Sequence, residues 1–131
     1  MKLVFFCLAN REQCVPPTAV LKTKLQEAGL GRKKIFFHWQ ACAIDFKARL
    51  EEIYPKLKES GGFEILKGGT QTSDLVLIQP PRSGYSVACL RDASELGQAI
   101  AFIRPIQNNL DISPTQVVNS FEVSFQNYWY A

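Results

Sequence analysis

The sequence lacks the residue patterns that most metal and redox sites need. It has a single histidine and four cysteines, at positions 7, 14, 42 and 89, and no two cysteines have the C-x-x-C spacing. Zinc sites and dithiol redox sites are usually built from such closely spaced ligands. We therefore expect no metal and no other cofactor. Cys7 and Cys89 lie in apolar runs and are interpreted as buried free thiols.

Long apolar runs and an excess of one charge are also missing. No run approaches the roughly 20 apolar residues of a membrane-spanning helix, and the apolar start favours a core strand over a short signal peptide. The 15 basic and 12 acidic residues are interspersed and leave a net charge of +3, whereas nucleic-acid binders gather basic residues on one face. We expect neither a membrane nor a nucleic-acid partner, and an intracellular location, cytoplasmic or nuclear.

Apolar residues are plentiful and follow a readable pattern. They make up 47% of the 131 residues, enough for one domain with a substantial core. The clearest periodicity lies in the helix expected at 44–57, where an apolar residue recurs every three or four positions. Pro55 is expected to kink this helix or end its regular part near Tyr54. The apolar stripe is formed by Phe46, Leu50, Ile53 and Leu57.

The other expected elements surround this helix in the sequence. A first helix is opened by Pro16-Pro17 and stopped by Gly29, and strands are expected at 2–8, 35–39, 63–67, 75–79 and 100–106. After residue 113, capping-box spacing favours a C-terminal helix, although Phe121, Val123 and Phe125 also alternate as in a strand. We expect these residues in the core: Phe46, Leu50, Ile53, Phe63, Ile65, Leu77 and Phe102.

From Ile35 to Gln107 the element order resembles that of ubiquitin-like β-grasp domains. The resemblance is carried by the helix stripe, by the Gly68-Gly69 turn, and by Tyr85 to Leu90 leading into Ala101 to Arg104. It implies an α+β fold, a mixed sheet with one main helix and with residues 2–8 as the central strand. Residues 1–110 would form the domain, with an insertion at 10–33, and residues 111–131 a C-terminal extension that we expect to be helical.

The resemblance also implies a function. Ubiquitin-like domains usually bind other proteins, so we expect a non-catalytic protein-interaction module within a larger intracellular protein, possibly of the ubiquitin pathway. A covalent modifier is not expected, because such modifiers end in an exposed Gly-Gly and this chain ends in Ala131. Another protein would bind the exposed face or edge of the sheet, where Lys33, Lys34, Leu66 and Arg104 are the candidate partner-binding residues.

Two alternatives stay open at this point. The lysines could instead protect an exposed sheet edge from unwanted pairing. Read from its start, the order of elements also resembles a thioredoxin-like domain, in which Cys14, just before the first helix, would be a redox thiol. The missing second cysteine argues against that interpretation. His38 lies in an apolar strand and is interpreted as a core or edge residue, so we expect no catalytic residues.

Overall fold

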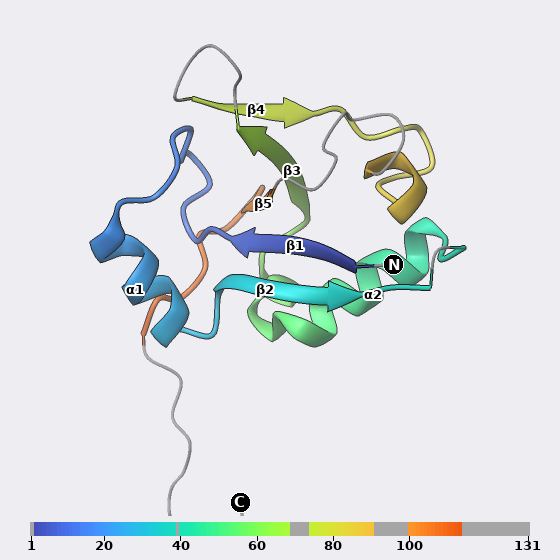
Figure 1. Ribbon diagram of the computed structural model, residues 1–131. Coiled ribbons are helices and arrows are strands. Elements are labelled where there is room, and N and C mark those ends of the chain that lie inside the picture. Colours follow the sequence, from blue (N-terminus) through green and yellow to red (C-terminus); the bar gives the residue numbers. More distant parts are fainter. Residues whose placement is uncertain (1, 39, 69–73, 91–99, 114–131) are drawn as a thin grey trace, which may run out of the picture.

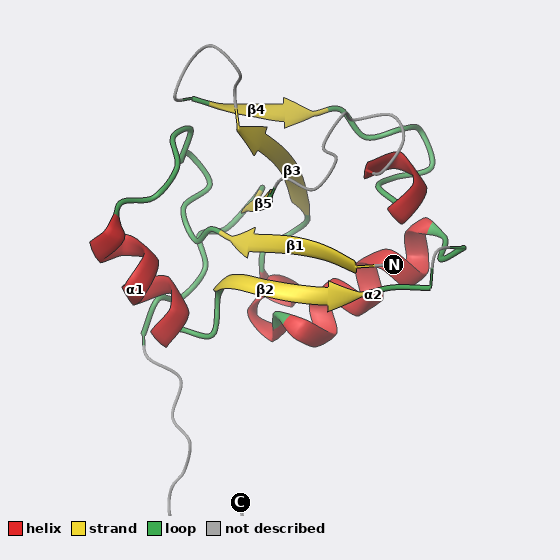
Figure 2. Cartoon of the chain, viewed as in Figure 1, coloured by secondary structure: helices red, strands yellow, loops and turns green. Residues whose placement is uncertain are grey.

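A five-stranded mixed sheet with the strand order β2-β1-β5-β3-β4 forms the centre of the computed structural model, which describes residues 2–38, 40–68, 74–90 and 100–113 (Figures 1 and 2). The central strand β1 (Lys2–Cys7) pairs antiparallel with β2 (Gly31–Phe36) and parallel with β5 (Ala101–Pro105). Strand β3 (Phe63–Gly68) pairs antiparallel with both β5 and the edge strand β4 (Leu75–Ile78). The α+β class expected from the sequence is therefore confirmed.

Helical segments accompany this sheet, and two of them are α-helices whose bounds are fully described. Helix α2 (Ala43–Ile53) packs on one face and is followed by a 3₁₀ helix, η1 (Pro55–Glu59). The break at Tyr54 confirms the effect expected of Pro55, which cannot donate a backbone hydrogen bond. Helix α1 (Ala19–Glu27) lies between β1 and β2 in the chain, and the Thr18 side chain caps it by accepting a bond from the Leu21 N–H at 3.3 Å.

Strand β2 starts earlier than the sequence predicts. We expected it at Ile35, whereas it begins at Gly31, whose φ of 80° lies in the region that favours glycine. The reason is pairing with β1, because Arg32 and Lys34 stand opposite Phe6 and Val4 in the ladder. The segment between β1 and β2, residues 8–30, is called the insertion below.

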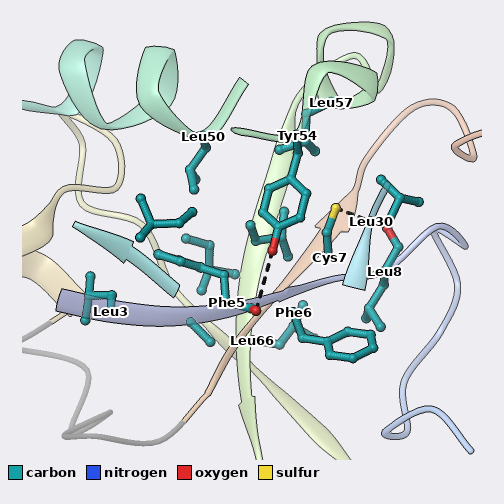
Figure 3. Close-up of a cluster of buried hydrophobic side chains, with 14 of the residues drawn as sticks. Leu3, Phe5, Phe6, Cys7, Leu8, Leu30, Leu50, Tyr54, Leu57 and Leu66 are labelled. Atoms are coloured by element: carbon teal, nitrogen blue, oxygen red, sulfur yellow. Dashed lines mark hydrogen bonds between the residues drawn. The ribbon is translucent and has the colours of Figure 1, made fainter. Parts of the chain in front are cut away.

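The face of the sheet toward α2, called the inner face, holds most of the core. The Phe5 ring lies 6.0 Å from the Phe46 ring of α2, and alternate β1 residues share its direction. Phe46, Leu50 and Ile65 are fully buried there, as expected. Figure 3 shows Leu50 in this part of the core, together with Phe5 and Tyr54. The other four expected core residues are only partly buried and pack against the buried core, Ile53 and Phe63 from this side of the sheet and Leu77 and Phe102 from the opposite one.

The opposite, outer face is covered in part by the insertion. The register places Glu64, Leu66, Phe102 and Arg104 on this face. The Gln13 carbonyl accepts a bond from Arg104 of β5 at 2.8 Å, and the next residue, Cys14, accepts one from the Leu75 N–H of β4 at 2.7 Å. The insertion is therefore bonded to both neighbours of β3 in the sheet.

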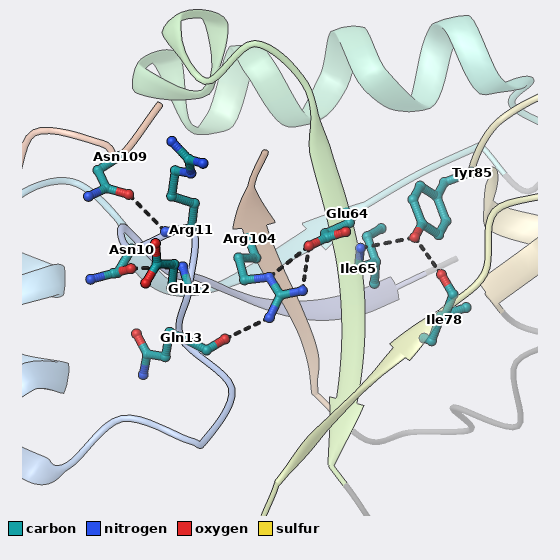
Figure 4. Close-up of polar contacts among 10 residues, drawn as sticks. All are labelled: Asn10, Arg11, Glu12, Gln13, Glu64, Ile65, Ile78, Tyr85, Arg104 and Asn109. Carbon is teal, nitrogen blue, oxygen red and sulfur yellow. Dashed lines mark hydrogen bonds and ion pairs between the residues drawn. The ribbon is translucent and has the colours of Figure 1, made fainter. Parts of the chain in front are cut away.

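A buried tyrosine, Tyr85, bridges the strands β3 and β4. The Tyr85 hydroxyl accepts a bond from the Ile65 N–H at 3.1 Å and donates one to the Ile78 carbonyl (Figure 4). Its ring stacks on Phe63 with centroids 6.3 Å apart. The turn-rich stretch from Tyr85 to Leu90 is thereby fixed to the sheet.

Two further expectations concern the chain as a whole. Within the described ranges, no helix combines the length and the apolar character needed to cross a membrane. The C-terminal helix expected from residue 114 onward, and the Gly69 end of the Gly68-Gly69 turn, lie outside the described residues.

Candidate functional site

The four candidate partner-binding residues lie in different environments. Lys33 faces α2, not solvent: its Nζ donates to the Ile53 carbonyl at 3.1 Å and lies 4.9 Å from the centre of the Tyr54 ring. A cation at the last carbonyl of a helix offsets the negative end of the helix dipole. Lys33 therefore holds the C-terminus of α2 and is half-buried.

Arg104 is also engaged within the domain. Its Nε donates to the Glu64 carboxylate at 2.8 Å, Nη2 forms an ion pair with the same oxygen, and Nη1 donates to the Gln13 carbonyl (Figure 4). The side chain is 17% exposed. Because one guanidinium joins β3, β5 and the insertion, Arg104 fastens the insertion to the sheet.

Leu66 is not on an exposed surface. The sequence predicts it on the open face of the sheet, and the register does place it on the outer face, but it is only 1% exposed. The expectation that it is accessible is wrong, because Leu66 is part of the buried core. A partner bound to the surface of this domain does not touch Leu66.

Lys34 alone of the four lies open to solvent. It sits on the outer face of the edge strand β2, in a row with Arg32 and Phe36. Phe36 is 65% exposed, which is unusual for a large aromatic side chain. The neighbouring β1 residues on this face are Lys2, which is exposed, and Val4, which is half-buried. We call Lys2, Val4, Arg32, Lys34 and Phe36 the β2-edge surface.

The backbone of β2 is open along part of this surface. The Arg32 N–H points away from β1, because it donates to the Gln26 side chain. Alternate residues of a strand point their backbone groups the same way, so those of Lys34 and Phe36 also face outward. Apart from the ladder with β1, the described residues form no hydrogen bond to the backbone of either.

A pocket adjoins the Arg32 end of this surface, between α1 and the sheet. Its volume is about 380 Å³. Its apolar part includes the rings of Phe6 and Phe102, whose centroids are 5.9 Å apart. Lys22 and Arg32 line its polar part, and no carboxylate is found among its described lining residues. An anionic side chain would be favoured in this position over a cationic one.

Sequence reasoning missed Phe36, Arg32 and Lys22. Phe36 was expected only as one residue of the apolar strand at 35–39. The signal that could have identified it is the alternation Arg32, Lys34, Phe36, which places all three on one face once the strand is allowed to begin at Gly31. Lys22 carries no comparable signal, because only the packing of α1 brings it near the sheet.

The thiols do not form a reactive group. Cys14 is exposed but lies five positions before α1 begins, so it is not at the helix N-terminus as the thioredoxin-like alternative needs. The antiparallel pairing of β1 with β2 also differs from the parallel β-α-β unit of that alternative. Cys42, at the N-terminus of α2, instead donates to Asp45 of its own first turn at 3.3 Å.

Buried titratable groups are held in their neutral forms. Burial raises the pKa of the Cys7 thiol to about 12, and the nearby Lys33 opposes part of this shift. Burial also raises the pKa of Tyr54, whose hydroxyl donates to the Gly31 carbonyl at 2.7 Å. Figure 3 shows the longer contact of this hydroxyl with the Phe5 carbonyl, at 3.5 Å. Both groups are part of the core. His38 lies exposed beyond the end of β2, and its Nδ1 accepts a bond from the Gln40 N–H at 3.2 Å.

Within the described part of the chain, no three His, Cys, Asp or Glu residues are grouped so that they could hold a metal ion. The candidate site is therefore the β2-edge surface, which is defined by the positions of its exposed side chains. Comparisons with protein families, with curated proteins and with solved structures find no significant match to this chain.

Proposed function

We propose that this chain is a ubiquitin-like protein-interaction module without catalytic activity, and that it binds its partner through the β2-edge surface. The strand order β2-β1-β5-β3-β4, with α2 packed on one face, supports a β-grasp arrangement. The observation that carries the binding proposal is the 65% exposure of Phe36 at the end of an edge strand, beside Lys34 of β2 and opposite Lys2 of β1.

The chemistry of this surface fits recognition and not catalysis. Phe36 and Val4 offer apolar contact, and Lys2, Arg32 and Lys34 add positive charge on the same face. An apolar centre supplies most of the affinity of a protein interface, and charges at its rim tune encounter rate and specificity. The partner is thus expected to present an apolar group within an acidic surface.

Site-specific photo-crosslinking tests this proposal. A photoreactive phenylalanine analogue placed at position 36 should give a discrete protein adduct in lysate from cells that express this chain. The same analogue at Ile44, which is 80% exposed on α2, serves as the control and should not give that adduct. The captured protein is then purified, and its Kd for the unmodified domain is measured.

Charge reversal identifies the surface. Lys34→Glu should weaken binding of the purified partner by roughly tenfold or more, whereas Lys58→Glu, on the exposed side of η1, should leave Kd nearly unchanged at the same net charge. Equal effects of both changes, or adducts of equal yield from positions 36 and 44, would remove the β2-edge surface as the binding site.

A further inference from the structure

We infer that the β2-edge surface takes an extended acidic peptide segment of a partner protein, which adds as a strand beside β2. This inference rests on the proposed function and specifies the partner's chemistry. In strand addition, the backbone of the peptide forms hydrogen bonds with the edge strand, and its alternate side chains provide specificity.

The backbone of β2 limits where the added strand can lie. The outward-facing N–H of Arg32 already donates to the Gln26 side chain. The outward-facing backbone groups of Lys34 and Phe36 are open to a partner strand. The opposite edge of the sheet differs, because the Leu75 N–H of β4 already donates to the Cys14 carbonyl. The open stretch accommodates a short segment, centred beside Lys34 and Phe36.

The side chains of β2 specify the sequence of that segment. Arg32, Lys34 and Phe36 are spaced two residues apart and share the outer face. Residues opposite each other on neighbouring strands interact directly, and opposite charges there are favourable. The peptide should therefore carry acidic side chains beside Arg32 and Lys34 and an apolar side chain beside Phe36, with one residue between each.

The pocket beside α1 strengthens the acidic preference at the Arg32 end. Lys22 and Arg32 both line it, next to the Phe6 and Phe102 rings. An acidic side chain beside Arg32 would lie near two cations, with its methylene groups over apolar surface. Because α1 belongs to the insertion, this part of the site is a product of the insertion and not of the sheet alone.

Synthetic peptides test the inference on the whole chain. Two hexapeptides are used, one with acidic residues at positions 1 and 3 and leucine at 5, and one with the reverse order, because the added strand can run in either direction. Each is titrated into isotopically labelled protein and followed by backbone amide NMR. At least one should bind with a Kd of about 1 mM or below and shift the amide signals of Lys34 and Phe36.

Three controls separate strand addition from simple charge attraction. A peptide of the same composition with its acidic residues adjacent should bind at least about fivefold more weakly, because alternate spacing is lost. N-methylation of the peptide amides that face β2 should abolish binding, whereas methylation of the other amides should not. Arg32→Glu and Lys34→Glu should each weaken binding, while Lys58→Glu should not.

The outcomes distinguish this inference from the function on which it rests. Equal binding of the adjacent-acid peptide, or no effect of N-methylation, overturns strand addition. If no peptide binds although the protein captured from position 36 does, the inference is wrong and the interaction surface stands. If neither the peptides nor a captured protein bind, both fail, and the lysines are better explained as protection of an exposed edge.

Discussion

The two faces of the sheet are covered by different means. The inner face is covered by α2, an amphipathic helix whose buried residues Phe46 and Leu50 follow a regular spacing. The outer face is covered by the insertion, which has an irregular course between Ala9 and Thr18 and is attached through backbone and side-chain hydrogen bonds to Arg104 and Leu75. A periodic cover can be found in a sequence, whereas an irregular one cannot.

The difference also decides where the domain is open. Helix α2 and η1 lie along the inner face, whereas the insertion bonds to Arg104 of β5, to Leu75 of β4 and, through Gln26, to Arg32 near the start of β2. The outer side of β2, at Lys34 and Phe36, is left exposed. An incomplete cover thus creates the candidate site.

The largest expected effect on the free energy of unfolding comes from substitutions in the core, one on each side of the sheet. Leu50→Ala on the inner side and Leu66→Ala on the outer side should each lower the free energy of unfolding by about 2–5 kcal/mol, because both side chains are fully buried. Urea unfolding monitored by circular dichroism measures this. Ile44→Ala, at a site that is 80% exposed, should change stability by no more than about 0.5 kcal/mol. A near-neutral Leu66→Ala would mean that the outer side of β3 is not part of a closed core.

The attachment of the insertion should be the next most sensitive feature. Arg104→Met leaves the Glu64 carboxylate and the Gln13 carbonyl without their partner, so we expect a loss of about 1–3 kcal/mol. The Leu75 amide, which donates to Cys14, should exchange hydrogen faster in this variant.

The matched control is the ion pair of Arg49 with Glu52 on α2, whose side chains are 40% and 67% exposed. Arg49→Met should cost less than about 1 kcal/mol. If the two arginine variants have equal stability and equal Leu75 exchange, Arg104 does not fasten the insertion.

Alkaline pH should lower the free energy of unfolding, because the Cys7 thiol is buried on the inner face. Burial raises the pKa of this thiol from 9.0 to about 12, so the folded state holds the proton more tightly than the unfolded state. The resulting stability is complete below about pH 9 and is lost as the pH rises toward 12, by at most about 1.4 kcal/mol per pH unit. The raised pKa of Tyr54 adds a loss of the same sign above about pH 10.

The free energy of unfolding, measured by urea titration between pH 8 and 10, checks this dependence. Cys7→Ala should reduce the slope above pH 9, because it removes the thiol that ionises on unfolding. Ile44→Ala should keep the wild-type slope. An unchanged slope in Cys7→Ala would show that another group causes the alkaline loss.

The smallest effect compares two adjacent lysines on opposite faces. Lys33→Ala removes the bond to the Ile53 carbonyl and the contact with the Tyr54 ring, and should cost about 0.5–1.5 kcal/mol. Lys34→Ala, on the exposed outer face, should lie within about 0.5 kcal/mol of the wild type. Thermal unfolding of the two variants side by side measures the difference, and equal melting temperatures would contradict the assignment of the two lysines to different faces.

Part of the candidate site was accessible from the sequence. The position of Lys34 on a basic edge strand was predicted, and the structure places it there. The role of Lys33 was not predicted, because Lys33 and Lys34 are adjacent in the strand and so point to opposite faces. The role of Arg104 was not predicted, because its partner Glu64 is set by the register of β3 with β5. The sequence placed the start of β2 four residues too late, since Arg32 and Lys34 are polar residues that pairing with β1 brings into the sheet.

The sequence by itself determined the inner half of this protein. The spacing of Phe46 and Leu50 specifies an amphipathic helix, and Pro55 ends its regular part, since both effects act over a few neighbouring residues. Tertiary structure alone decided the outer half. Whether Leu66 is buried and Phe36 exposed depends on how segments far apart in the sequence pack together, through contacts such as that of Gln13 with Arg104, residues 91 positions apart.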